Sequence, residues 1–139
     1  MSLDPGGASA AQPRDLQPPT ILVVDDEAMV RMDICAALAD RGYRCIDVAD
    51  GAEALARFDA LAPALVVTDI YMTETDGLEV IRQLRRQRIE TPILAISGAD
   101  HKYDVLAIAK RLGANATLEK PFVVEEVVRV VDALLGGAG

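Results

Sequence analysis

The sequence lacks the features of a membrane, secreted or nucleic-acid-binding protein. No apolar run approaches the roughly 18 residues that a membrane span requires, and no basic start followed by an apolar core marks a secretion signal. Its 14 basic residues are outnumbered by 22 acidic ones, so the net charge is −8. That charge argues against nucleic acid as a direct partner. We therefore expect a soluble, cytoplasmic protein.

Cysteine and histidine are also scarce. Cys35 and Cys45 have neither metal-site nor C-x-x-C spacing. Because disulfides are rare in the cytosol, both are predicted to be thiols in the core. His101 is the only histidine, and it is interpreted as a surface residue rather than a phosphotransfer group.

The two ends of the chain differ from its middle. Residues 1–19 are rich in Pro, Gly and Ala and show no periodicity, so they are expected to be disordered, with a possible expression scar at the start. Residues 136–139, Gly-Gly-Ala-Gly, are expected to be a flexible tail. Residues 20–135 carry most of the apolar content and suit one domain with a real core.

Within that domain, short apolar runs alternate with helical patterns. Runs at 20–24, 44–48, 64–68, 92–96 and 116–118 precede helical patterns at 27–40, 51–61, 77–88, 101–112 and 124–135. In the first helix, Val30, Ile34 and Leu38 share one face, whereas Arg31 and Asp33 face away. Five strands alternating with five helices predict a doubly wound α/β domain with a five-stranded parallel sheet.

Carboxylates follow the first and third apolar runs. Asp25 and Asp26 come directly after the first run, and Asp69 closes the third. In open parallel sheets, the binding crevice lies beyond the carboxyl ends of the strands. If these two strands are neighbours, three carboxylates meet there, and such an all-oxygen set favours Mg²⁺.

The fourth and fifth runs add groups that suit phosphate. Ser97 ends one run and is followed by Gly98, whose small size leaves backbone N–H groups accessible, and Lys120 follows the other. Carboxylates, a metal, a hydroxyl and an ammonium together indicate phosphoryl transfer. A carboxylate can itself accept the phosphoryl group as an aspartyl phosphate.

Four fragments carry a resemblance to a known family. "VVDDE", "VVTDIYM" followed by "DG", "AISG" and "EKPF" occur in this order at the ends of strands. Over residues 20–135 the chain resembles the response-regulator receiver domain of two-component signalling. The resemblance implies a flavodoxin-like (βα)5 fold with strand order 2-1-3-4-5. It also implies that Asp69 accepts a phosphoryl group from a sensor histidine kinase or phosphotransfer protein.

The resemblance also implies roles for the other site residues. Asp26 would bind Mg²⁺ directly with Asp69 and the backbone carbonyl of Tyr71, and Asp25 would act largely through water. Ser97 would be the switch hydroxyl that moves to the phosphoryl group, with Gly98 beside it. Lys120 would pair with the phosphate, next to a cis peptide bond at Pro121.

Three positions depart from the family pattern. After Asp69 the family commonly has Met-Pro, whereas here Met72 is followed by Thr73, so the acceptor loop is less stiffened. Thr117 occupies the position of the aromatic switch residue, so a ring cannot turn inward there. Val123 stands where a capping Ser or Asp would begin the last helix. The output of the domain is therefore expected to differ from the usual coupling.

Other functions fit the sequence less well. A non-phosphorylated pseudo-receiver would not need the complete set of acids and lysine. A phosphatase or phosphomutase with an aspartyl-phosphate intermediate would typically have a second acid at position 71, where this chain has Tyr71. A nucleotide-binding fold would have a Gly-rich turn after the first strand.

The last helix offers a possible output surface. Its apolar residues at 124, 127, 128, 130, 131, 134 and 135 span an arc wider than core packing requires. One interpretation is a deeply seated helix. The other is an exposed edge, Val128 with Leu135 or else Val130, that binds a second receiver or an effector.

Overall fold

The computed structural model describes residues 17–72, 76–98 and 104–136. Most of both expected tails, together with Thr73 and His101, lies outside the described residues. The elements are β1 (Thr20–Val24), α3 (Ala28–Asp40), β2 (Arg44–Val48), α4 (Gly51–Leu61), β3 (Leu65–Asp69), α5 (Gly77–Arg86), β4 (Ile93–Gly98), α6 (Val105–Leu112), β5 (Ala116–Lys120) and α7 (Val124–Leu134). No helix in these ranges is long and apolar enough to cross a membrane.

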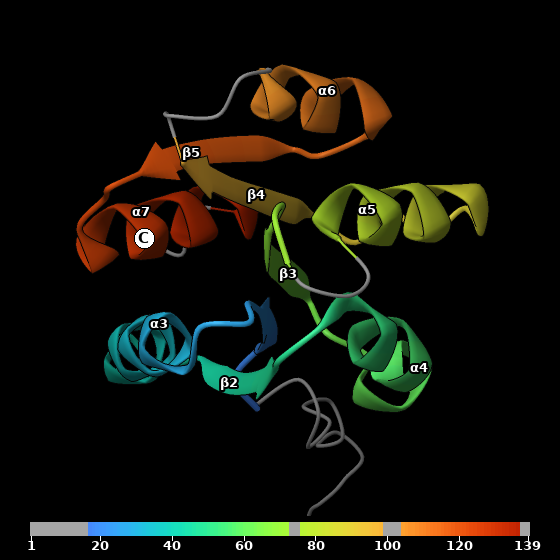
Figure 1. The fold of residues 1–139 in the computed structure, drawn as a ribbon. Coiled ribbons are helices and arrows are strands. Elements are labelled where there is room, and N and C mark those ends of the chain that lie inside the picture. The colour runs from blue at the N-terminus through green and yellow to red at the C-terminus, as the bar shows by residue number, and fades with distance from the viewer. Residues whose placement is uncertain (1–16, 73–75, 99–103, 137–139) are drawn as a thin grey trace, which may run out of the picture.

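The five strands form one parallel sheet in the order β2-β1-β3-β4-β5. Helices α3 and α7 cover one face of the sheet, and α4, α5 and α6 cover the other (Figure 1). This arrangement confirms the predicted doubly wound fold and its strand order. Because β1 and β3 are neighbours, the acidic ends of these two strands lie side by side.

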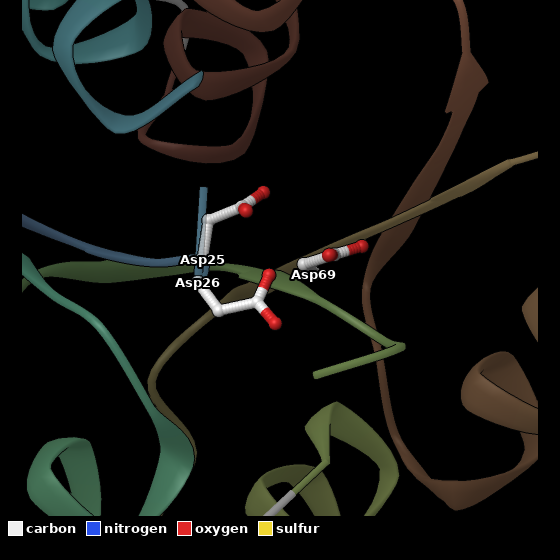
Figure 2. A group of neighbouring side chains, drawn as sticks. All are labelled: Asp25, Asp26 and Asp69. Carbon is white, nitrogen blue, oxygen red and sulfur yellow. The ribbon is translucent and has the colours of Figure 1, made fainter. Parts of the chain in front are cut away.

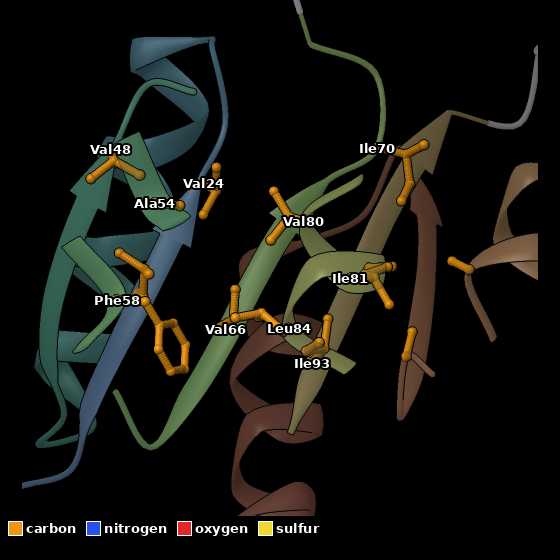
Figure 3. Packing of buried hydrophobic residues seen from close by; sticks show 14 of the residues in the cluster. Val24, Val48, Ala54, Phe58, Val66, Ile70, Val80, Ile81, Leu84 and Ile93 are labelled. Carbon is orange, nitrogen blue, oxygen red and sulfur yellow. The ribbon is translucent and has the colours of Figure 1, made fainter. Parts of the chain in front are cut away.

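The central strands are apolar because both of their faces are covered. Every residue of β3 is buried, and so is every residue of β1 after Thr20. The core beneath α4, α5 and α6 joins residues such as Val66, Ile81 and Phe58 (Figure 3). A second core lies beneath α3 and α7 and includes Ile34 and Val127. The sheet is therefore a rigid platform between two apolar layers.

Several element ends differ from the predicted ones. Helix α6 begins at Val105, because the carboxylate of Asp104 caps it by accepting the N–H of Ala107 at 3.1 Å. Strand β5 continues to Lys120, since its pairing with β4 extends to Gly98 opposite Lys120. This extension carries the lysine to the same edge of the sheet as Ser97.

The prediction of two free core thiols is wrong. Cys35 of α3 and Cys45 of β2 form a disulfide, with Cα atoms 5.5 Å apart. The sequence argument relied on spacing and compartment, but α3 packs directly on β2 and brings the two partly buried side chains together. A Cα separation of this size is typical of disulfides.

A cluster of polar contacts joins the carboxyl-terminal end of α3 to α7. It consists of Arg41, Tyr43 and Asp132, and we refer to it as the α3–α7 clamp. The Arg41 Nε donates to Asp132 Oδ2 at 2.7 Å, and the hydroxyl of buried Tyr43 donates to Asp132 Oδ1. Two donors therefore satisfy the Asp132 carboxylate.

The valine and leucine residues of helix α7 are buried or partly buried, and they do not form an exposed stripe. Val127 and Val131 are fully buried, and Val128, Val130 and Leu135 are partly buried against the same core. Its first N–H groups lack a side-chain cap at Val123, although Glu126 accepts the Val123 N–H at 3.2 Å. The burial favours the deeply seated interpretation over an exposed apolar edge.

Candidate functional site

The buried polar side chains of the described residues gather at one edge of the sheet. They are Asp25, Thr68, Asp69 and Ser97. Asp25 follows β1, Thr68 and Asp69 end β3, and Ser97 is the penultimate residue of β4. Burying polar groups costs free energy unless a partner offsets it. Their concentration at the carboxyl edge marks a site in the crevice where such folds bind ligands.

Three carboxylates converge at this edge. Asp25, Asp26 and Asp69 each place one carboxylate oxygen within 4.8 Å of the others. Figure 2 shows the side chains of Asp25, Asp26 and Asp69 close to one another at the ends of β1 and β3. Asp25 and Asp69 are only 2% and 6% exposed, whereas Asp26 is exposed. The cluster therefore extends from the interior to the surface.

Lys120 is the cation of the site. Its Nζ lies 3.6 Å from Asp69 Oδ2, 3.7 Å from Asp25 Oδ2 and 3.5 Å from Glu27 Oε1. The peptide bond that follows it, to Pro121, is cis. One ammonium thus faces several carboxylates and cannot neutralise all of them.

Burial and crowding perturb the acids and the lysine. Burial is the largest cause that raises the pKa of Asp69 to about 7; the charge of Asp25 adds to it, and Lys120 offsets only part of the rise. Burial likewise raises the pKa of Asp25. Burial alone would lower the pKa of Lys120, but Asp69, Asp25 and Glu27 together outweigh it and raise that pKa. The site therefore holds more negative charge than its own cation balances.

The backbone around Asp25 is tightly held. Its N–H donates to the Val48 carbonyl at 3.3 Å, its side chain accepts the Glu27 N–H at 2.9 Å, and its carbonyl accepts from Arg31 Nη1 at 2.7 Å. By helical period Arg31 lies off the apolar face of α3, but its side chain does not extend away from the fold. Its side chain is only 18% exposed, because it reaches back over the start of the helix.

Ser97 and Gly98 lie beside the acids, at the end of β4. Ser97 is fully buried, and its hydroxyl has no hydrogen-bond partner among the described residues. An unpartnered buried hydroxyl is uncommon and calls for an explanation. Gly77 begins α5 so close to the end of β3 that a Cβ would lie 2.2 Å from the Asp69 carbonyl oxygen.

The site opens into a cavity of about 780 Å³. Its lining combines the acids Asp26 and Asp69 with Lys120, Gly98 and Tyr71, and it continues over apolar residues of α3 and the start of α7. Thr117 does not contribute to this lining. The large apolar residues exposed in the described part of the chain are Met29, Met32, Tyr71 and Val123, and they belong to the segments that line the cavity.

The carboxylates fit a small divalent cation. Mg²⁺ prefers oxygen ligands at about 2.1 Å, so ligands on opposite sides of the ion lie about 4.2 Å apart. The oxygens of Asp25, Asp26 and Asp69 already lie within 4.8 Å of one another. Small side-chain movements would complete such a site, and the cation would also offset the uncompensated negative charge.

Comparison with known proteins places this geometry in a family. A sequence model of the response regulator receiver domain matches residues 21–132. The chain is 38% identical over 115 residues to the alkaline phosphatase synthesis transcriptional regulatory protein PhoP of Bacillus subtilis, covering 83% of this chain and 48% of PhoP. It is 40% identical over 118 residues to the response regulator MprA of Mycolicibacterium vanbaalenii, covering 85% and 51%.

Solved structures agree with the sequence relatives. The receiver domain of NtrX from Brucella abortus has a TM-score of 0.77 at 34% identity, covering 83% of this chain and 97% of that one. A Francisella response regulator receiver domain has a TM-score of 0.79 at 27% identity, covering 87% and 99%. The chain spans about half the length of the curated relatives it matches. It belongs to the response regulator receiver domain family of two-component systems.

Proposed function

We propose that this domain is a phosphorylatable switch in which Asp69 accepts a phosphoryl group in a Mg²⁺-dependent reaction. The observation that carries the proposal is the environment of Asp69. Its carboxylate is 6% exposed, clusters with Asp25 and Asp26, and lies 3.6 Å from the Lys120 ammonium at the edge of an open cavity. The donor is a phosphohistidine on a sensor histidine kinase or phosphotransfer protein.

The transfer is a displacement at phosphorus. An Asp69 carboxylate oxygen forms the new O–P bond, the P–N bond to the donor imidazole breaks, and the imidazole leaves with the bonding pair. Lys120 moves its charge from the carboxylate to the arriving phosphoryl oxygens. Asp26, Asp69 and the Tyr71 backbone carbonyl would hold Mg²⁺, with Asp25 acting through water, and the bound ion would supply further neutralisation of phosphoryl charge.

Ser97 supports a response to the phosphoryl group. Its buried hydroxyl has no partner among the described residues, so turning to donate a hydrogen bond to a phosphoryl oxygen would cost no existing bond. The small Gly98 leaves its N–H accessible for the same oxygens. Since Thr117 is a small, partly buried residue of β5, the movement at Ser97 is passed on without rotation of a ring at that position.

The surroundings of the cavity suit a protein donor. Met29 and Met32, which are 69% and 63% exposed, lie on the first turns of α3, and Val123 is 59% exposed at the start of α7. Exposed apolar side chains in such a group are typical of a protein interface. We propose that the donor protein docks over these residues and places its phosphohistidine in the cavity.

The pseudo-receiver alternative has less support, because a pure binding module would gain nothing from the costly burial of Asp25 and Asp69. Some relatives are named transcriptional regulators, and this chain covers about half of each. We therefore propose no transcriptional activity for the domain itself.

The direct test is labelling with a small phosphoryl donor. The protein is incubated with acetyl phosphate or phosphoramidate, and its intact mass is measured with Mg²⁺ or with EDTA. We expect one phosphoryl group per chain with Mg²⁺ and none with EDTA. Asp69→Asn should abolish the mass increase.

Asp33→Asn is the matched control, because Asp33 lines the same cavity but lies outside the acid cluster. That variant should be labelled like the unchanged protein. Labelling that persists in Asp69→Asn would show that another residue is the acceptor. An absence of labelling in the unchanged protein would favour the pseudo-receiver.

A further inference from the structure

Arg31 joins α3 to β2 and to the segment that follows β1, beside the acid cluster. From α3, its Nη1 donates to the Asp25 carbonyl at 2.7 Å, and its Nε donates to Asp47 Oδ2 of β2 at 2.8 Å. The side chain is 18% exposed, whereas that of Asp47 is 43% exposed. The guanidinium group therefore binds the Asp25 carbonyl through Nη1, and the bond from Nε to Asp47 fixes the position of the group itself.

The bond to the Asp25 carbonyl fixes a particular peptide unit. That carbonyl belongs to the peptide group joining Asp25 to Asp26, so its orientation sets the direction in which the Asp26 side chain leaves the backbone. The N–H of Asp25 donates to the Val48 carbonyl, and the Asp25 carboxylate accepts the N–H of Glu27. Asp26 is exposed, and the direction in which its side chain leaves the backbone follows from this peptide unit.

We infer that Arg31, anchored by Asp47, is a positioning residue for the metal pocket. It orients the Asp25–Asp26 peptide so that both carboxylates face Asp69. This inference rests on the proposed Mg²⁺ site. It assigns a function in the site to a helix residue that the hydrophobic pattern placed on the solvent side.

Charge and geometry make opposite demands on Arg31. As a charge near three carboxylates, it should repel Mg²⁺, so that its removal would tighten cation binding. As a positioning residue, Arg31 should strengthen Mg²⁺ binding, and its removal would weaken that binding. Lysine separates the two effects further, because it keeps the charge but lacks the planar fork that bonds two acceptors at fixed angles.

The experiment measures Mg²⁺ affinity by the shift of backbone amide NMR signals of residues 25, 26 and 69 during a titration. We expect Arg31→Lys and Arg31→Gln each to weaken binding about fivefold, the scale of the net contribution of one ordinary hydrogen bond. Unchanged affinity in Arg31→Lys, or tighter binding in Arg31→Gln, would overturn the inference.

Two controls separate positioning from general loosening. Arg57→Gln removes an equal charge from an exposed pair with Glu53 on α4, and it should leave the affinity unchanged. Tyr43→Phe loosens the α3–α7 clamp at the far end of α3, so it should lower stability without changing the affinity. If Tyr43→Phe weakens Mg²⁺ binding as much as Arg31→Lys, positioning by Arg31 is wrong. If the unchanged protein binds no Mg²⁺, the proposed metal site fails instead.

Discussion

The acid cluster and the α3–α7 clamp both place carboxylates beside a cation, yet they treat that charge differently. In the clamp, the Tyr43 hydroxyl and the Arg41 guanidinium donate to Asp132, and the hydrogen bond from Tyr43 leads the lowering of the pKa of Asp132. In the acid cluster, burial and like charges raise the pKa of Asp69 to about 7. The protein's own donors satisfy the Asp132 carboxylate, whereas the charge of the acid cluster around Asp69 is not fully offset by the protein.

The difference separates structural charge from functional charge. A carboxylate with two donors stabilises the fold and has little capacity left for a ligand. A cluster with three carboxylates and one lysine is unfavourable until a cation offsets its negative charge. Helix α3 connects the two, because the acids Asp25 and Asp26 precede it and Arg41 follows it.

The largest expected effect concerns the disulfide on that helix. The Cys35–Cys45 bond closes a loop with a sequence separation of 10, for which chain entropy gives about 3 kcal/mol of stability. Reduction with dithiothreitol should lower the free energy of unfolding in urea by roughly that amount. Mg²⁺ affinity should stay unchanged, since Arg31 holds the first turn of α3 independently.

The double variant Cys35→Ser with Cys45→Ser is the control for this experiment, and its stability should not respond to the reductant. Equal stability of the oxidised and reduced wild-type protein would mean that the bond contributes nothing to the fold. A loss of Mg²⁺ affinity on reduction would show that the whole of α3, rather than Arg31, sets the geometry of the pocket.

The second largest expected effect is a difference in stability between two Asp→Asn substitutions, one in each region, measured without metal at pH 8. Asp69→Asn should raise the free energy of unfolding by on the order of 2 kcal/mol, because it removes a buried and crowded charge. Asp132→Asn should lower it by about 1 kcal/mol, because it weakens hydrogen bonds to a charged acceptor. Urea unfolding of both variants measures the two signs, and equal signs would remove the distinction between the regions.

The same pair should differ in pH dependence. The pKa of Asp69 is raised in the folded state, so its contribution to stability is lost as pH rises from its ordinary 3.8 to about 7. The pKa of Asp132 is lowered in the folded state, so its contribution is present above 3.8 and is lost as pH falls through the folded pKa. Each Asn variant should abolish its own part of this dependence.

The sequence predicted the sheet and most of the site because parallel strands place their carboxyl ends at one edge. That rule, combined with the strand order that the family resemblance implied, predicted that Asp25, Asp26 and Asp69 meet and that Ser97 and Lys120 lie at the same edge. The roles proposed for these residues still await experiment, whereas their proximity is a consequence of strand order.

Contacts that depend on side-chain reach or helix docking could not be predicted in this way. Arg31 lies off the apolar face by helical period, but its long side chain turns back to the preceding loop. The Cys35–Cys45 bond depends on how α3 sits on β2, and the argument from compartment pointed the other way. The Tyr43–Asp132 contact joins residues 89 apart in the sequence, and no local pattern marks it.

The most direct test of the account is the titration of the Asp69 carboxyl group by carbon-13 NMR. Without divalent cations, we expect a midpoint at about pH 7, and added Mg²⁺ should move that midpoint down because the cation stabilises the ionised form. A midpoint near the ordinary 3.8, unchanged by Mg²⁺, would contradict the claim that this site has an excess of negative charge that a metal ion offsets.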